Sequence, residues 1–134
     1  MKWMLEVVVV PVSDVDRARA FYADQLGFAV DHDTTVSNEM RVVQLTPAGS
    51  GCSIVIGTGI ARSEPGSLQG LQLVVADIRA AHAELSARGV AVSEIQVLGK
   101  NPVPGGDALD NVGFVYFNDP DGNGWAVQQI SSHG

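Results

Sequence analysis

A few side chains in this 134-residue chain are of types that could take part in acid/base chemistry. His32 stands between Asp31 and Asp33, and an imidazole flanked by carboxylates can serve as a general acid or base. The same trio is also typical of a solvated loop or an exposed strand. Tyr116 is a second residue that could transfer a proton without a cofactor. The sequence has no Ser, His and Asp order typical of nucleophilic catalysis and no Gly-rich phosphate-binding loop.

Other polar or reactive residues have a structural explanation beside the chemical one. Cys52 is the single cysteine, which excludes an intrachain disulfide and a cysteine-cluster metal site. No base near it in sequence suggests an activated thiol, so we expect Cys52 in the core. His82 is expected in a solvated position on a helix. Asp107 and Asp110 could close over a ligand or attract a cation, although acidic residues in loops are more often simply solvated.

The charge balance narrows the kinds of partner. Eight Lys and Arg against 15 Asp and Glu give a net charge of −7, so we expect neither nucleic acid nor an anionic membrane as a partner. The acidic surplus favours neutral or cationic ligands, or it serves only solubility. The longest apolar run, Val7–Val12, is far shorter than the roughly 20 residues of a membrane helix and predicts a buried strand. With no export signal at its N-terminus, the chain is expected to be cytoplasmic.

A weak internal repeat organises the chain. Three pairs of segments match at offsets of 63, 62 and 73 residues: Val12–Val15 with Val75–Ile78, Gly27–Val30 with Gly89–Val92, and Thr46–Cys52 with Asp119–Trp125. The jump in offset indicates an insertion in the second copy, which we assign to a loop over residues 99–113. We therefore predict a single domain over residues 1–134, made of two modules at about 1–57 and 68–131 with a linker at about 58–67.

Each module is predicted to run strand, helix, strand, strand, strand. The first helix begins at Ser13 or Asp14, with Ser13 and Asp16 spaced as in a capping box, and ends at Gly27. The second helix is capped by Asp77. The matched Pro/Gly-rich segments predict hairpin turns between strands. Numerous strands with only two helices indicate an α+β fold, with curved sheets covered by helices on their outer faces.

The motifs that form these helix starts and turns resemble those of the vicinal oxygen chelate superfamily, which includes glyoxalase I, bleomycin-resistance proteins and extradiol dioxygenases. The matching stretches occur in the family's order and span nearly the whole chain: Val12–Tyr22, Leu26–Phe28 and Asp119–Asn123. The resemblance implies paired βαβββ modules whose sheets form a cup-like cavity. It also implies a homodimer that completes or exchanges modules.

The resemblance further implies where metal ligands would lie. In metal-dependent members, His, Gln or Glu ligands lie seven residues before the helix-capping Asp and three after the Asn of the turn. In this sequence the corresponding positions hold Val7, Ser53, Gly70 and Ala126. These residues cannot replace imidazole or carboxylate ligands, so we expect no metal and no cofactor. A register shift by one would bring in Glu6, but its side chain would lie on the opposite strand face.

Strand alternation turns a set of side chains toward the cavity that the resemblance implies. Gln72 and Gln128 could orient a bound molecule by hydrogen bonding, or they could bond to each other or to the backbone. Gly70 and Ala126 suggest widened space beside them. Trp125 precedes Ala126 and is expected in the core, on the helix side. The predicted ligand-binding residues are Val7, Val9, Ser53, Val55, Gln72, Ala126 and Gln128.

These observations predict a metal-free small-molecule-binding protein of the glyoxalase/bleomycin-resistance type. Its ligand could be an antibiotic or another aromatic or cationic compound. The alternative is a lyase, isomerase or dioxygenase of the same superfamily, which would use a displaced metal site or the acid/base groups His32 or Tyr116. A third interpretation is a module that mainly mediates protein assembly.

Overall fold

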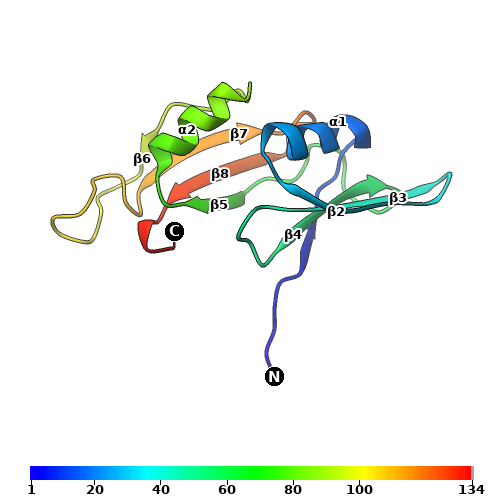
Figure 1. Cartoon of the computed structure of the whole chain (residues 1–134), viewed down its shortest axis with the longest axis horizontal. Coiled ribbons are helices and arrows are strands. Elements are labelled where there is room, and N and C mark those ends of the chain that lie inside the picture. The colour runs from blue at the N-terminus through cyan, green and yellow to red at the C-terminus, as the bar shows by residue number, and fades with distance from the viewer. Residues whose placement is uncertain (134) are drawn as a thin grey trace. The chain divides into compact units, whose positions relative to one another are not determined.

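The computed structural model describes residues 1–133, and their contacts group them into two units, which we describe separately (Figure 1). Unit 1 consists of Met1–Leu68 together with Asp119–Asn123. Unit 2 consists of Gln69–Asn118 and the described residues from Gly124 onward. Within residues 1–133, no helix has the length and apolar character needed to cross a membrane.

Unit 1 contains one βαβββ module. Its elements are β1 (Val7–Val9), α1 (Val15–Ala20), a π-helical continuation η1 (Phe21–Gln25), β2 (Ala29–Ser37), β3 (Met40–Thr46) and β4 (Ser53–Thr58). The sheet order is β1-β4-β3-β2, with β1 parallel to β4 and the other pairs antiparallel. The chain leaves β1 through α1, and α1 packs on one face of this sheet, against β4.

The start of α1 differs in one respect from the prediction. Asp14 is the N-cap, and its carboxylate accepts the Arg17 backbone N–H at 3.1 Å. Ser13 does not form the predicted capping box with Asp16, because its hydroxyl donates to the Asp121 carboxylate instead, at 2.5 Å. Gly27, at φ +77°, ends the helical segment as predicted.

Unit 2 repeats the same order of elements. They are β5 (Leu71–Val75), α2 (Ile78–Ala87), β6 (Gln96–Val97), β7 (Gly113–Asn118), β8 (Gly124–Gln129) and a 3₁₀ turn, η2 (Ser131–His133). The sheet order is β5-β8-β7-β6, which corresponds strand for strand to unit 1. Asp77 caps α2 by accepting the backbone N–H groups of Arg79 and Ala80. The predicted α+β fold with paired βαβββ modules is therefore confirmed.

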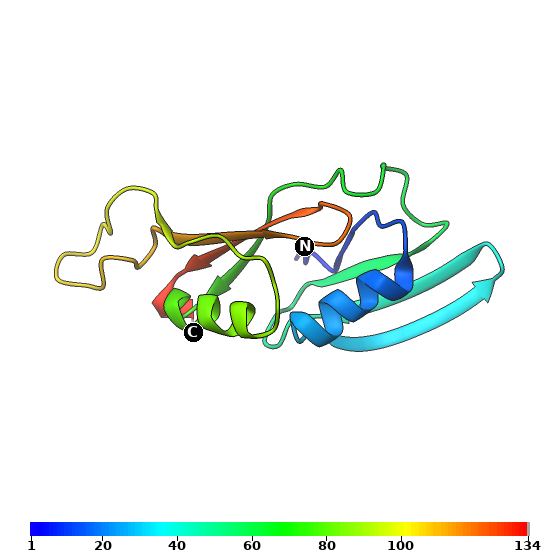
Figure 2. The ribbon, with the colours of Figure 1, turned by 90° about the horizontal axis from the view of Figure 1, so that it is seen from above.

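The core of each unit lies between its sheet and its helix, and Figure 2 shows α1 in blue and α2 in light green along their own sheets. In unit 2, Trp125 is 4% exposed and its ring stacks on Phe117 with centroids 6.0 Å apart. The predicted core position of Trp125 is confirmed. Cys52 was also expected in the core, but it lies in the turn before β4 and is only half-buried.

A buried polar network explains the Asp-Pro-Asp-Gly-Asn turn that precedes β8. Asn123 is fully buried, and its side-chain amide donates to the Pro11 carbonyl and to the Asp119 carboxylate, each at 2.8 Å. The Leu68 backbone N–H donates to Asn123 Oδ1 at 3.0 Å, and the Tyr22 hydroxyl donates to Asp119 at 2.8 Å. The turn therefore fixes the end of β1 and the η1 segment within unit 1.

Candidate functional site

The sheet of unit 2 has one face covered by α2, which packs on β7 and β8. We call the other face the open face of this sheet. Strand register places Gln72, Ala126 and Tyr116 in one row across the open face. Gln128 and Phe114 lie in the next row, beside Val74 of β5. The structure thus brings together the three predicted residues of unit 2 and adds two aromatic side chains.

Two aromatic side chains lie next to each other on the open face. Phe114 and Tyr116 alternate along β7, so both project on the open face, where each is half-buried. Their rings are parallel within 6°, with centroids 6.2 Å apart. Phe114 is not among the ligand contacts predicted from the sequence. Aromatic residues alternate along β7, and Phe114 and Tyr116 pair with Gln128 and Ala126. This alternation in the sequence could have indicated Phe114 as a ligand contact.

Tyr116 also borders a hollow of about 380 Å³ at the outer edge of β7. The hollow is lined by the segment Ala91–Ser93 and by Tyr116, Phe117 and Asn118. Ser93 fixes that segment to β7, because its backbone N–H donates to the Tyr116 carbonyl and its hydroxyl accepts the Tyr116 N–H, both at 2.9 Å. The hollow is shallow and open to solvent, and its volume lies at the lower end of the range for small-molecule pockets.

The two glutamines on the open face are bonded to each other and to the backbone. Gln72 Nε2 donates to Gln128 Oε1 at 2.5 Å, and Gln128 Nε2 donates to the Asn111 carbonyl at 2.7 Å. This chain of bonds holds both amides in one orientation. Gln72 is exposed, and its carbonyl oxygen makes no hydrogen bond to another described residue, so it can accept one from a ligand.

The open face of the unit 1 sheet holds the other four predicted residues. Val7 pairs with Ser53, and Val9 pairs with Val55, which places all four side chains on one face. Val9 is 42% exposed, whereas Ser53 and Val55 are buried. On this face Val9 is therefore the most accessible of the four to a ligand.

A small polar cluster, which was not predicted from the sequence, adjoins Ser53 on this face. The hydroxyl oxygens of Ser53 and Thr46 lie 2.6 Å apart and share a hydrogen bond. Thr46 Oγ1 also donates to the Asp31 carboxylate, and Gln44 Nε2 donates to the same carboxylate at 3.2 Å. Asp31 reaches the cluster because β2 is irregular between Val30 and the following pair. Ser53 is thus engaged with protein groups rather than merely leaving space.

A comparison of the sequence with models of known protein families shows the family to which this chain belongs. The model of the Glyoxalase/Bleomycin resistance protein/Dioxygenase superfamily matches residues 5–127. The chain belongs to this superfamily. Among curated proteins, no match was found.

Solved structures of the superfamily are similar over almost the full length of the chain. TnmS3, an antibiotic binding protein from Streptomyces sp. CB03234, is 33% identical with a TM-score of 0.76, and the match covers 97% of this chain and 98% of that one. A glyoxalase/bleomycin resistance protein from the same organism is 34% identical with a TM-score of 0.71, covering 94% and 100%. A superfamily member from Sphaerobacter thermophilus DSM 20745 is 26% identical with a TM-score of 0.75, covering 96% and 98%.

The positions where metal-dependent members of the superfamily would hold their ligands do not fit a divalent ion. The side chains there are those of Val7, Ser53 and Ala126, with none at Gly70, and the single donor among them is the Ser53 hydroxyl, which bonds to Thr46. Across residues 1–133, no three His, Cys, Asp or Glu side chains lie close enough together to hold a metal ion.

The backbone conformation gives a reason for glycine at position 70 besides the predicted spatial one. It lies just before β5 at φ +86°, a backbone conformation that favours glycine. A Cβ atom added to Gly70 would meet no atom within 4 Å, so the space beside it is open without glycine. The predicted widening of a cavity at this glycine stays a prediction.

The trio around His32 is divided between the two faces of the unit 1 sheet. Asp31 joins the polar cluster beside Ser53, whereas Asp33 receives two hydrogen bonds from the Arg41 guanidinium, at 2.9 and 2.8 Å. The hydrogen bond from Arg41 lowers the pKa of Asp33. His32 itself is exposed on β2. The exposed-strand interpretation of this trio is therefore confirmed.

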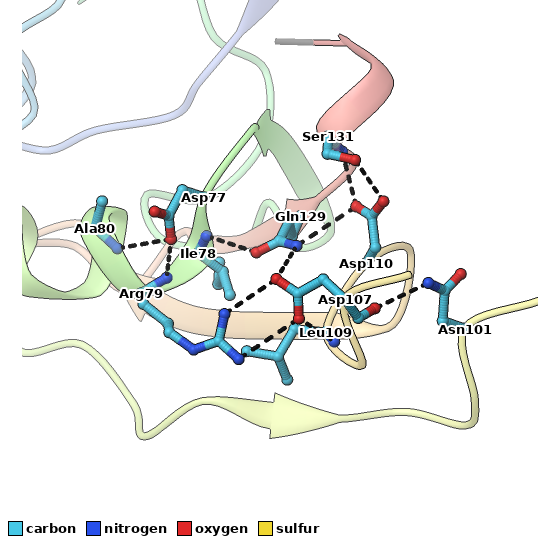
Figure 3. Close-up of polar contacts among 10 residues, drawn as sticks. All are labelled: Asp77, Ile78, Arg79, Ala80, Asn101, Asp107, Leu109, Asp110, Gln129 and Ser131. Carbon is cyan, nitrogen blue, oxygen red and sulfur yellow. Dashed lines mark hydrogen bonds and ion pairs between the residues drawn. The ribbon is translucent and has the colours of Figure 1, made fainter. Parts of the chain in front are cut away.

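The inserted loop of unit 2 is fixed by two carboxylates, which Figure 3 shows with their partners. Asp107 accepts hydrogen bonds from Leu109 N–H at 2.9 Å, from Arg79 of α2 at 3.1 Å and from Gln129 of β8 at 3.3 Å. Asp110 accepts the Ser131 backbone N–H at 2.8 Å and the Ser131 hydroxyl. Neither Asp107 nor Asp110 is a freely solvated loop acid, since both hold the loop against the body of unit 2.

This network predicts a specific loss of stability in acid. The backbone N–H of Leu109, followed by Arg79 and Gln129, lowers the pKa of Asp107 from 3.8 to about 2. A lowered folded-state pKa stabilises the fold above the unfolded value, and this contribution is lost as pH falls from 3.8 to about 2. Melting temperatures of the wild type and Asp107→Asn, measured by circular dichroism, should differ most above pH 4 and converge near pH 2. A difference that does not change with pH would contradict this role.

Proposed function

We propose that this chain binds a planar aromatic small molecule without a metal ion. The observation that carries the proposal is the parallel pair of Phe114 and Tyr116 rings on the open face of the unit 2 sheet. Flat apolar rings stack favourably on a planar ligand, and the hollow beside Tyr116 adds concave surface. The −7 net charge favours a neutral or cationic compound over an anionic one.

Polar groups at the edge of the aromatic surface would orient the ligand. The amide of Gln72 is held by Gln128 and keeps a carbonyl oxygen available, so it would accept a hydrogen bond from a ligand N–H or O–H. Such a few fixed polar groups on an apolar surface supply specificity in small-molecule sites. The proposed contact residues, all on the open face of the unit 2 sheet, are Gln72, Phe114, Tyr116, Ala126 and Gln128. The open face of the unit 1 sheet, taken by itself, offers Val7, Val9, Ser53 and Val55 as further proposed ligand contacts.

An antibiotic is the proposed kind of ligand. TnmS3, which is similar to this chain over almost its full length, is an antibiotic binding protein. The positions that would hold metal ligands in this superfamily carry no suitable donor set, which supports binding rather than metal-assisted catalysis. We also propose that the chain works as a homodimer.

Calorimetry with a panel of planar aromatic compounds, antibiotics included, tests the proposal. The protein is treated with a chelator first, and compounds with an amine are paired with their uncharged acetylated forms. We expect at least one compound to bind with a Kd tighter than about 100 μM and to raise the melting temperature. If no compound in the panel binds more tightly than about 1 mM, the proposal is overturned.

A further inference from the structure

Asp31 carries a negative charge on the open face of the unit 1 sheet, and this charge has no counter-ion within the described chain. No Lys, Arg or His side chain of residues 1–133 forms an ion pair with Asp31. Asp33, two residues along β2, is instead paired with Arg41 at 2.8 Å and with Arg19 at 3.6 Å. Unit 1 therefore neutralises one of these two carboxylates and leaves the other one uncompensated.

A bulge in β2 directs Asp31 to the open face. Val30 lies opposite Leu45 of β3, and the next pair joins His32 to Gln44, so Asp31 is an extra residue in the ladder. A bulge of this kind changes the direction of a side chain, and bulges are frequent beside active sites. The regular pairing of β2 is thus interrupted at the residue that carries the uncompensated charge.

The hydrogen bonds around Asp31 run toward its carboxylate. Gln44 Nε2 donates to Asp31 Oδ2 at 3.2 Å, and the Thr46 hydroxyl donates to the same oxygen. Because Thr46 has a single hydroxyl hydrogen, Ser53 is the donor in the 2.6 Å bond between the two hydroxyls. These bonds fix Oδ2, whereas Oδ1 forms no hydrogen bond to another described residue and can accept one from a ligand.

The side chains next to this cluster suit an organic cation better than a metal ion. Val55 of β4 pairs with Gln44 on one side and with Val9 of β1 on the other, so two aliphatic side chains adjoin the cluster on the same face. Val9 is 42% exposed and is accessible to the carbon atoms of a ligand. Mg²⁺ and Ca²⁺ require several oxygen ligands and gain nothing from contact with valine.

We propose that Asp31 binds the protonated primary or secondary amine of a small molecule on the open face of unit 1. The ammonium N–H donates to Asp31 Oδ1, and the positive charge supplies the counter-ion that the chain itself does not provide. This inference deepens the proposed function, because it names the charged group of the ligand. It rests on that function only in that the open face of unit 1 contacts a small molecule, and not on the rings of unit 2.

NMR titration of the ¹⁵N-labelled full chain at pH 7 tests the site with a matched pair of probes. Tryptamine carries a protonated primary amine, and N-acetyltryptamine is its uncharged form. We expect tryptamine to shift the backbone amide signals of Asp31 and Thr46 and to bind at least about 5-fold more tightly than the acetylated form. Equal affinity for the two probes, or unshifted signals at both residues, overturns the proposal.

Asp31→Asn removes the charge with little change of shape. The asparagine oxygen can still accept from Thr46 and Gln44, while its NH₂ group takes the place of Oδ1. Tryptamine should therefore bind at least about 5-fold more weakly, and N-acetyltryptamine should be unaffected. Glu39→Gln is the matched control, because it removes the same charge from the exposed turn between β2 and β3, and it should change neither affinity. A control variant that weakens tryptamine as much as Asp31→Asn overturns the proposal.

Two outcomes separate this site from the proposed function. Panel compounds that bind equally well as amines and as acetylated forms would contradict only the Asp31 site. Conversely, an Asp31-dependent tryptamine site together with no panel compound that binds more tightly than about 1 mM would contradict only the proposed function.

Discussion

Replacing Asn123 by alanine is expected to lower the free energy of unfolding by about 3 kcal/mol. The substitution removes two donors and one acceptor from a fully buried site. It leaves the Leu68 N–H without its acceptor, and the Pro11 carbonyl keeps only the hydrogen bond from the Gly66 N–H. Buried polar groups that lose a hydrogen bond each cost about 1–3 kcal/mol. Urea unfolding followed by circular dichroism measures the change.

Two further variants separate this network from general effects of substitution. Tyr22→Phe removes only the hydroxyl that donates to Asp119, which still accepts from Asn123, so a loss of about 1 kcal/mol is expected. Asn38→Ala, at the exposed turn between β2 and β3, should change stability by less than about 0.5 kcal/mol. Equal stability of Asn123→Ala and Asn38→Ala would contradict the structural role of the turn.

The double variant Phe114→Ala, Tyr116→Ala is expected to weaken binding of an aromatic ligand by about 30- to 100-fold. Each ring that stacks on the ligand contributes about 1 kcal/mol or more, and a change of 1.4 kcal/mol is tenfold in Kd. The pair lies half-buried on the open face, away from the α2 side of the sheet, so the fold should survive. Calorimetric titration with the tightest compound of the panel measures the effect.

Leucine at the same two positions distinguishes stacking from apolar burial alone. Phe114→Leu with Tyr116→Leu keeps most of the apolar volume but removes the flat rings, so an intermediate loss of affinity is expected. His32→Ala, on the exposed β2 strand, should leave the ligand Kd unchanged. An alanine double variant that binds as tightly as the wild type would place the ligand elsewhere.

Much of the fold could be predicted because the repeat carries local signals twice. Asp14 and Asp77 both cap helices, and both Pro/Gly-rich segments form turns between strands. Strand alternation correctly placed Gln72 and Gln128 on the face opposite Trp125. These features depend on a few neighbouring residues, so the sequence is sufficient for them.

Features that depend on distant partners could not be predicted. Ser13 bonds to Asp121, 108 residues away, and this long-range contact replaces the expected capping box. Asp31 reaches the polar cluster through an irregularity in β2, which no local motif marks. The Asp107 network joins a loop, a helix and a strand. The strand β6 has only two residues, whereas its counterpart in unit 1, β2, has nine. Such contacts become visible only when the chain is folded.

We expect this superfamily member to bind its ligand without a metal ion. The measurement that tests it most directly is calorimetry with the tightest compound of the panel, on chelator-treated protein before and after saturation with Zn²⁺, Mn²⁺ or Ni²⁺. We predict the same Kd in every case, because the positions of Val7, Ser53, Gly70 and Ala126 offer no set of metal donors. Binding that appears only after a divalent ion is restored would contradict the account.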